Sequence, residues 1–140
     1  MTSMPREFAT EFEIAWADCD PAGIVFYPHF FRFMDTAFQR LLAAKGTCQA
    51  GLQAAFGVVG TPIVEANARF RSPARPLDRL AISISGPAWS ARTFRVDYVA
   101  RIGAGVAFEG YEVRVLARAE AAGRLATIAP PSAFKDLFTL

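Results

Sequence analysis

The first periodic segment of the chain, residues 7–16, alternates between apolar and polar positions. The apolar side chains that share one face are Phe8, Phe12, Ile14 and Trp16, and the acidic ones opposite are Glu7, Glu11 and Glu13. Because successive side chains of a strand point to opposite faces, this pattern predicts a half-buried strand. The turn residues of "DPAG", at 20–23, end the alternation.

A helical period replaces the alternation from His29 onward. The apolar positions that recur at intervals of three and four are Phe30, Met34, Ala37, Phe38, Leu41 and Leu42. This spacing predicts a helix with one apolar face, and Phe31 and Phe33 widen that face, so we expect burial on most sides. Pro28 suits the first helical position and Gly46 suits a stop.

Four further alternating segments follow a linker of uncertain form at residues 48–60. Their apolar sets are Val64, Ala66, Ala68 and Phe70; Leu80, Ile82 and Ile84; Phe94, Val96, Tyr98 and Ala100; and Tyr111, Val113 and Val115. The segments "GPAWSART" and "RIGAGVA" are typical of hairpin connections. We expect residues 127–138 to close the chain with a short helical turn.

The predicted order is a strand, one long apolar helix and four more strands. Such an order favours the α+β class with an antiparallel sheet, which covers a single apolar helix if the sheet curls around it. The 140 residues suit one domain, residues 1–140. Since the edges of an open sheet invite pairing with a second copy, we expect a homodimer or homotetramer.

Composition narrows the class of protein. The chain is 53% hydrophobic and 20% charged, as globular domains are, and its net charge of +2 with scattered arginines argues against nucleic acid as a partner. No apolar run reaches the length of about 18 residues that crosses a membrane, and the start has no apolar signal core, so we expect a cytoplasmic protein. Cys19 and Cys48 form no metal-binding spacing with the single histidine, so we expect no metal.

Asp20 is the candidate for chemistry, because it lies between the predicted strand and the predicted helix. A carboxylate beside an apolar run is partly desolvated. The first N–H groups of a helix that begins near Pro28 lack helical partners, carry partial positive charge and can hold an oxyanion. The carboxylate of Asp20 and these N–H groups together predict an acyl-transfer site. The plainer alternative is that Asp20 only forms the turn and that His29 is a cap or surface residue.

Two stretches resemble a known family. "DCDPAGIVFYPHFFRFMD", residues 18–35, resembles the signature of the 4-hydroxybenzoyl-CoA thioesterase family of hotdog-fold enzymes, and "GTPIVEANARFRSP", residues 60–73, resembles its second motif. The resemblance covers nearly the whole chain. It implies a hotdog fold, in which a curved antiparallel sheet of about five strands wraps one long central helix. It also implies an acyl-CoA thioesterase without a cofactor, since a thioester is already activated.

The resemblance assigns roles within the first motif. Asp20 matches the catalytic carboxylate, which acts as a nucleophile on the thioester carbonyl or as a base that activates water. The backbone N–H of Tyr27 matches the oxyanion donor. Gly23 matches a turn glycine that leads into the helix, and His29 falls near a histidine that another branch of the family carries.

It also assigns binding residues outside that motif. Thr61 falls where the 4-hydroxybenzoyl branch lines its acyl pocket, with Pro62 and Ile63 beside it. Trp89 and Arg92, in "AWSARTF", match a hairpin that meets the nucleotide end of CoA.

Substrate choice is where the chain departs from the family pattern. Ser90 and Ala91 replace basic residues of the hairpin, and residues 47–56 lack a tryptophan found near the acyl pocket of that branch. An aromatic, hydroxybenzoyl-like acyl-CoA is the expected substrate. The alternatives are a short-chain acyl-CoA, an acyl-carrier-protein thioester, or acyl-CoA binding without catalysis.

Overall fold

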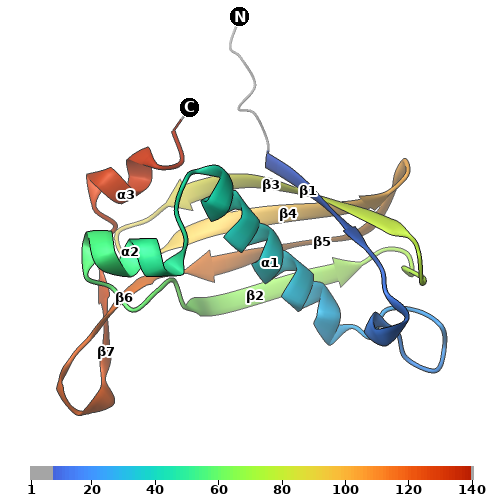
Figure 1. The fold of residues 1–140 in the computed structure, drawn as a ribbon, viewed down its shortest axis with the longest axis horizontal. Coiled ribbons are helices and arrows are strands. Elements are labelled where there is room, and N and C mark those ends of the chain that lie inside the picture. The colour runs from blue at the N-terminus through green and yellow to red at the C-terminus, as the bar shows by residue number, and fades with distance from the viewer. Residues whose placement is uncertain (1–7, 140) are drawn as a thin grey trace, which may run out of the picture.

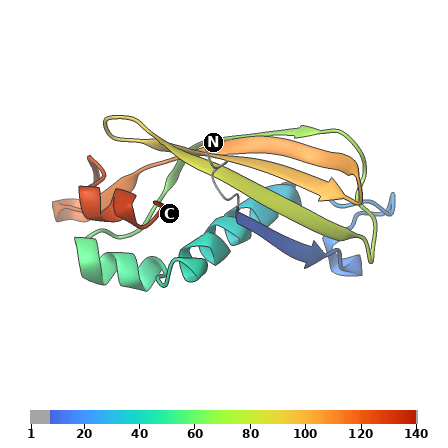
Figure 2. The ribbon, with the colours of Figure 1, turned by 90° about the horizontal axis from the view of Figure 1, so that it is seen from above.

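A curved five-stranded sheet and one long helix form the body of the protein (Figures 1 and 2). The structure is a computed structural model and describes residues 8–139. The main elements are β1 (Phe8–Glu13), α1 (Pro28–Ala44), β2 (Ile63–Phe70), β3 (Arg79–Trp89), β4 (Phe94–Ile102) and β5 (Gly105–Arg114). The strands are antiparallel in the order β1-β3-β4-β5-β2. This arrangement confirms the α+β class and the single central helix.

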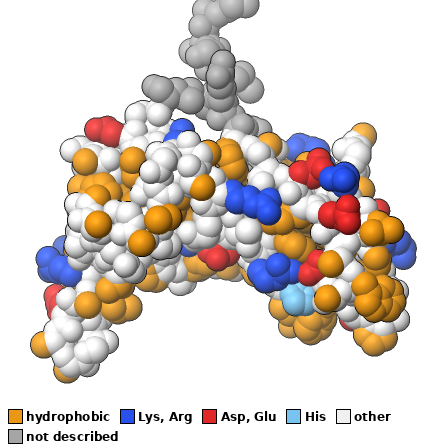
Figure 3. Space-filling model, in the orientation of Figure 1, with side chains coloured by type: hydrophobic (Ala, Val, Ile, Leu, Met, Phe, Trp, Pro, Cys, Tyr) orange, Lys and Arg blue, Asp and Glu red, His pale blue; other side chains and the backbone are white. Residues whose placement is uncertain are grey.

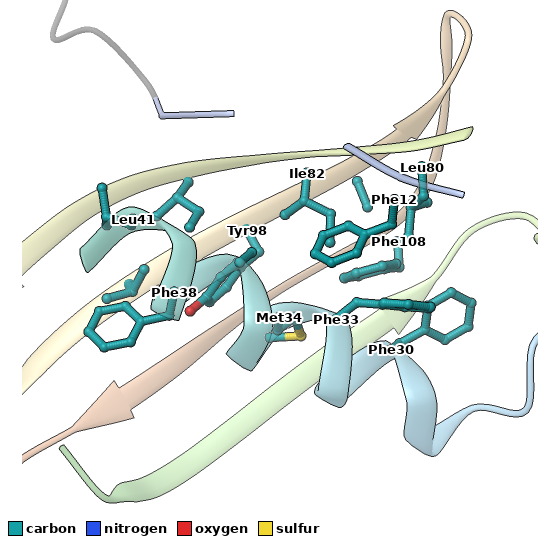
Figure 4. Close-up of a cluster of buried hydrophobic side chains, with 14 of the residues drawn as sticks. Phe12, Phe30, Phe33, Met34, Phe38, Leu41, Leu80, Ile82, Tyr98 and Phe108 are labelled. Carbon is teal, nitrogen blue, oxygen red and sulfur yellow. The ribbon is translucent and has the colours of Figure 1, made fainter. Parts of the chain in front are cut away.

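The core lies between α1 and the concave face of the sheet (Figure 4). Phe33, Met34 and Phe38 of α1 are almost fully buried, and so are the inward side chains of β3 and β4. Each such side chain contributes roughly 1.5–3 kcal/mol when it leaves water. This burial holds α1 firmly across the sheet, and its first residue is Pro28 as expected.

Smaller elements complete the chain. They are the 3-10 turns η1 (Trp16–Asp18) and η2 (Ala121–Gly123), helices α2 (Gln49–Phe56) and α3 (Ser132–Asp136), and strands β6 (Leu116–Ala119) and β7 (Leu125–Ile128). Helix α3 confirms the predicted closing turn, whereas the β6–β7 hairpin was not predicted. None of the helices within residues 8–139 is long and apolar enough to cross a membrane.

The first strand is shorter than predicted, since β1 ends at Glu13. Trp16 belongs to the 3-10 turn η1 instead, and 75% of its surface is exposed. The carboxylate of Asp18 accepts a hydrogen bond from the N–H of Ala15, at 2.9 Å, and the N–H of Asp18 bonds back to the Ala15 carbonyl, at 3.0 Å. This local turn competes successfully with the strand.

Strand β5 turns two of its three predicted apolar residues outward, while the third, Val115, follows the strand and is buried. Tyr111 and Val113 lie on the outer face, whereas Glu112 and Arg114 are buried on the inner face. The register explains this orientation, because Glu112 lies opposite Val96 of β4, whose side chain is in the core. Residues paired across neighbouring strands point to the same face.

Strand β2 forms one edge of the sheet and is largely exposed. Ile63, Val64 and Phe70 all keep large exposed surfaces. The strand forms where it was predicted, but both of its faces are exposed and its burial does not alternate. Within residues 8–139 nothing pairs with its outer edge. The edge is therefore open to another strand.

Candidate active site

The turn that carries Asp20 is tightly closed by its own backbone. The N–H of Gly23 bonds to the carbonyl of Asp20, at 2.9 Å, and the N–H of Ala22 bonds to Oδ1 of the Asp20 carboxylate, at 2.8 Å. Gly23 has a φ of 75°, in the left-handed region that favours glycine. Asp20 is half-buried, and its Oδ2 accepts no hydrogen bond from residues 8–139. One oxygen thus shapes the turn while the other is free to act.

Two contacts fix this turn to the rest of the protein. The N–H of Val25 bonds to the carbonyl of Ala74, at 2.8 Å, just before β3. Arg32, in the second turn of α1, forms an ion pair with Asp18. The Asp20 turn is therefore held in a set position relative to the start of α1.

The start of α1 offers one free backbone donor. Pro28 has no N–H, while the N–H groups of His29 and Phe30 bond to the carbonyls of Phe26 and Tyr27, at 2.9 and 3.2 Å. In the part of the chain that the structure describes, the N–H of Tyr27 has no acceptor. A free donor at a helix N-terminus can stabilise an oxyanion.

An open, mostly apolar pocket of about 400 Å³ lies beside this helix start. We call it the aromatic pocket, and its lining is Ile24, Val25, Tyr27, Phe30, Phe70, Arg71, Ser72, Pro73 and Ala74. Phe70, at the end of β2, packs against Phe30 and Tyr27, with ring centroids 5.3 and 6.5 Å apart. Figure 3 shows hydrophobic side chains gathered around His29 at this end of the molecule. The ring of His29 packs on Phe26, with centroids 5.9 Å apart.

A second, polar pocket of about 340 Å³ lies at the Ile63 end of β2. We call it the polar pocket, and its lining is Asp35, Gln39, Gln49, Thr61, Pro62, Ile63 and Arg114. The structure thus brings the predicted acyl-pocket residues 61–63 together with side chains that the sequence analysis did not single out. The side-chain amide of Gln49 donates to the hydroxyl of Thr61, at 2.9 Å, and to Oε1 of the Gln39 side chain, at 3.0 Å.

Arg114 binds two other residues that line the polar pocket, Asp35 and Thr61. Its guanidinium donates to Asp35 at 2.8 Å, to the carbonyl of Thr61 at 3.0 Å and to Glu112 at 2.9 and 3.1 Å. The hydroxyl of Tyr98 donates to the same carboxylate oxygen of Glu112. Burial, and then the charge of Glu112, raise the pKa of Tyr98, so its hydroxyl keeps its proton.

The charge of Arg114 is stabilised although the side chain is buried. Burial lowers the pKa of Arg114, but Glu112 and Asp35 outweigh burial and raise it above its ordinary value. The guanidinium also lies over the ring of Phe38, 4.1 Å from its centroid. Arg114 is therefore a fixed cation between the core and the pocket.

The hairpin assigned to CoA lies near α3, at the other end of the molecule from the Asp20 turn (Figure 1). Trp89 packs against Phe134 and Phe138, with ring centroids 5.8 Å apart in both cases. Arg92 donates to the carbonyl of Thr127 in β7, at 2.9 Å. The structure thus brings these two residues together but does not bring them near Asp20 of the same chain.

Comparisons with known proteins agree with this architecture. The family model described as the thioesterase-like superfamily matches residues 14–134. The chain is 35% identical over 94 residues to 4-hydroxybenzoyl-CoA thioesterase of Pseudomonas sp. strain CBS-3, and this alignment covers 65% of each protein. It is 32% identical over 85 residues to 1,4-dihydroxy-2-naphthoyl-CoA hydrolase of Synechococcus elongatus, and this alignment covers 61% of this chain and 62% of that relative. The alignments thus span slightly less than two thirds of these curated relatives.

A solved structure matches over nearly the full length. It is an Asp-to-Asn variant of 4-hydroxybenzoyl-CoA thioesterase in complex with 4-hydroxybenzoyl-CoA. The match has a TM-score of 0.87 and 29% identity, and it covers 96% of this chain and 99% of that one. These findings confirm the resemblance drawn from the two motifs and the hotdog fold. The chain belongs to the thioesterase-like superfamily.

Proposed function

We propose that the protein is an acyl-CoA thioesterase that hydrolyses an aromatic, hydroxybenzoyl-like acyl-CoA to the free acid and CoA. One observation carries the proposal: the turn and helix start beside the aromatic pocket hold both a free carboxylate oxygen, on Asp20, and a free backbone donor, the N–H of Tyr27. A nucleophile or base next to an oxyanion donor is the minimum that acyl transfer needs.

In the proposed reaction, Asp20 acts on the thioester carbonyl and Tyr27 stabilises the charge that develops on its oxygen. If Asp20 attacks directly, CoA thiolate leaves and the resulting anhydride is cleaved by water. If Asp20 acts as a base, it removes a proton from a water molecule that attacks the same carbon. Either route needs no metal or redox cofactor, because the thioester supplies its own leaving group.

The relatives support an aromatic acyl group. Both curated relatives are named for hydroxylated aromatic CoA thioesters, and the matched structure holds 4-hydroxybenzoyl-CoA in a variant that has lost one aspartate carboxylate. The aromatic pocket, with Tyr27, Phe30 and Phe70 in its lining, suits a flat ring. Gly23 permits the turn, and His29 borders the same end of the molecule.

We further propose that a second copy of the chain completes the site. Antiparallel pairing of two β2 edges around a two-fold axis sets the Ile63 end of one copy beside the Phe70 end of the other. The aromatic pocket of one copy then faces the polar pocket of its partner. In Figure 3 the β2 side of the molecule is hollowed, which leaves room for a partner. The hairpin with Trp89 and Arg92, distant from Asp20 of its own chain, becomes available to CoA bound by the partner.

The test is thiol release from a panel of CoA thioesters. The panel holds benzoyl, 4-hydroxybenzoyl, phenylacetyl, short-chain and long-chain esters, each tried with the native protein, Asp20→Asn and Asp97→Asn. Asp97 lies on the outer face of the sheet and serves as the matched control. We expect Asp20→Asn to lower kcat by about three orders of magnitude or more on aromatic esters.

Near-normal turnover by Asp20→Asn would remove Asp20 from the mechanism. Aspartate-dependent turnover of aliphatic esters alone would keep the mechanism and discard the aromatic substrate. Release of no thiol from any ester would overturn CoA-thioester hydrolysis and direct attention to carrier-protein thioesters or to binding without catalysis.

A further inference from the structure

The two acids of the "DCD" segment, Asp18 and Asp20, are held in different ways, and the proposed chemistry uses only the second. Only 13% of the side-chain surface of Asp18 is exposed. Its Oδ1 pairs with Arg32, and its Oδ2 accepts from the N–H of Ala15, at 2.9 Å. Resting on the proposed thioesterase function, we propose that Asp18 and Arg32 are positioning residues, whose ion pair sets the Asp20 carboxylate against the N–H of Tyr27.

A short antiparallel ladder joins the segment that carries Asp20 to the segment that leads into α1. The N–H of Phe26 donates to the carbonyl of Asp18, and the N–H of Asp20 donates to the carbonyl of Ile24, both at 2.9 Å. We call this pairing the 18–26 ladder. Asp20 lies on one of its arms, and Tyr27 directly follows the other. A shift of one arm against the other therefore changes the distance between the carboxylate and the oxyanion donor.

The ion pair ties the 18–26 ladder to the helix. The carbonyl of Phe26 accepts from the N–H of His29, at 2.9 Å, at the start of α1. Arg32, in the second turn of α1, reaches back to Asp18, whose carbonyl holds the N–H of Phe26. These contacts close a ring that contains both the helix start and the ladder. A ring of contacts holds the two in place more firmly than one backbone bond does, as supporting bonds do for a reactive group.

The ion pair should act on the rate of the reaction more than on folding or on substrate binding. The side chain of Arg32 is 52% exposed, and ion pairs of exposed arginines contribute little to stability. Neither Asp18 nor Arg32 belongs to the lining of the aromatic pocket or of the polar pocket. A misplacement of about 1 Å at the reacting groups can lower a rate by about 100-fold. Loss of the pair should therefore lower kcat and leave KM almost unchanged.

Arg40 supplies a matched control on the same helix. Like Arg32 it is exposed and lies over the ring of a phenylalanine, with 4.1 Å to the centroid for Arg40 and 4.7 Å for Arg32. It ties α1 to β1, since it donates to the hydroxyl of Thr10 at 2.8 Å and to the carbonyl of Glu11 at 3.0 Å. Neither of these bonds reaches the 18–26 ladder. A change at Arg40 therefore loosens the helix without touching the proposed ring.

The test combines kinetics with a measurement that needs no turnover. The proteins compared are the native chain, Arg32→Gln, Arg32→Lys, Asp18→Asn and Arg40→Gln. Their kcat and KM are measured on the ester that the native protein hydrolyses fastest, and urea unfolding shows that each is folded. Two-dimensional amide NMR spectra follow the signals of Ala22, which bonds to the Asp20 carboxylate, and of Tyr27.

We expect Arg32→Gln and Asp18→Asn to lower kcat by roughly 10- to 100-fold with KM nearly unchanged, and to shift the amide signals of Ala22 and Tyr27. The amide of Asp18→Asn leaves one acceptor oxygen for two donors. Arg32→Lys should recover most of the native kcat and the native signals, because the ion pair uses one guanidinium nitrogen and an ammonium group can take its place. Arg40→Gln should change neither kcat nor these signals.

A native kcat in folded Arg32→Gln would overturn the proposal. Equal losses of kcat in Arg32→Gln and Arg40→Gln would overturn it too, as would a fall in kcat while both amide signals stay in place. If the native protein hydrolyses no ester, the amide signals decide. Signals shifted by Arg32→Gln but not by Arg40→Gln would retain the positioning ring and refute only the proposed activity, whereas signals shifted by neither would refute the ring as well.

Discussion

Strands β4 and β5 carry the same three kinds of residue, a tyrosine, an acid and an arginine, on both of their faces. On the outer face Arg95 pairs with Asp97 and lies over the ring of Tyr111, 3.8 Å from its centroid, with the paired side chains 48% and 42% exposed. On the inner face the paired Arg114 and Glu112 are 2% and 1% exposed.

The difference between the two clusters lies in what their arginines hold. The outer arginine, Arg95, pairs with Asp97 at the solvent-exposed surface, where ion pairs contribute little to stability. The inner arginine continues to Asp35 and to the carbonyl of Thr61, which line the polar pocket. Burying an ion pair is costly, and apolar residues would often serve a core equally well. A buried cluster that ends at a pocket is therefore best explained by the pocket.

The largest effect should come from breaking the inner ion pair. Arg114→Met leaves Glu112 as a buried charge without its cation, so we expect a loss of about 3–5 kcal/mol in the free energy of unfolding. Arg95→Met, the matched change on the outer face, should alter the unfolding midpoint little. Urea unfolding followed by tryptophan fluorescence measures both. Equal losses in the two variants would abolish the distinction between the faces.

A smaller effect should come from removing one hydroxyl from each cluster. Tyr98→Phe deletes a buried donor to Glu112, and we expect it to lower the free energy of unfolding by about 1–3 kcal/mol. Tyr111→Phe deletes an exposed bond to Glu65 on the outer face, of 2.7 Å, and should leave the unfolding midpoint within experimental error. The same urea titrations serve, and a Tyr111→Phe variant less stable than Tyr98→Phe would reverse the expected order.

Local periodicity was enough to predict most of the fold. The three-and-four spacing from Phe30 to Leu42 and the proline at 28 defined α1, since a helix is set by residues close in sequence. The orientation of β5 was not predictable in this way. Tyr111 and Val113 look like core residues, and only the pairing of Glu112 opposite Val96 shows which face is buried.

The candidate site, too, was only partly predictable from the sequence. Asp20, Gly23 and Tyr27 lie within one short motif, so the sequence predicted their neighbourhood. The polar pocket joins Asp35 to Arg114, which is 79 residues further along the chain. A contact between residues so far apart in the sequence forms only once the sheet has folded. The sequence carries no local pattern that predicts it, apart from charged residues inside apolar stretches.

If one active site combines Asp20 of one copy with the polar pocket of its partner, mixed dimers should reveal it. Asp20→Asn and Asp35→Leu proteins are mixed, allowed to exchange subunits, and assayed with 4-hydroxybenzoyl-CoA. Asp35 lines the polar pocket, so we expect its replacement to impair that half of the site. If the site is shared, each mixed dimer holds one site with both native aspartates and one with neither. Turnover well above that of either parent should then appear on mixing. A mixture that shows only the average of its two parents would place both aspartates in the same chain's site and refute a site shared between two copies.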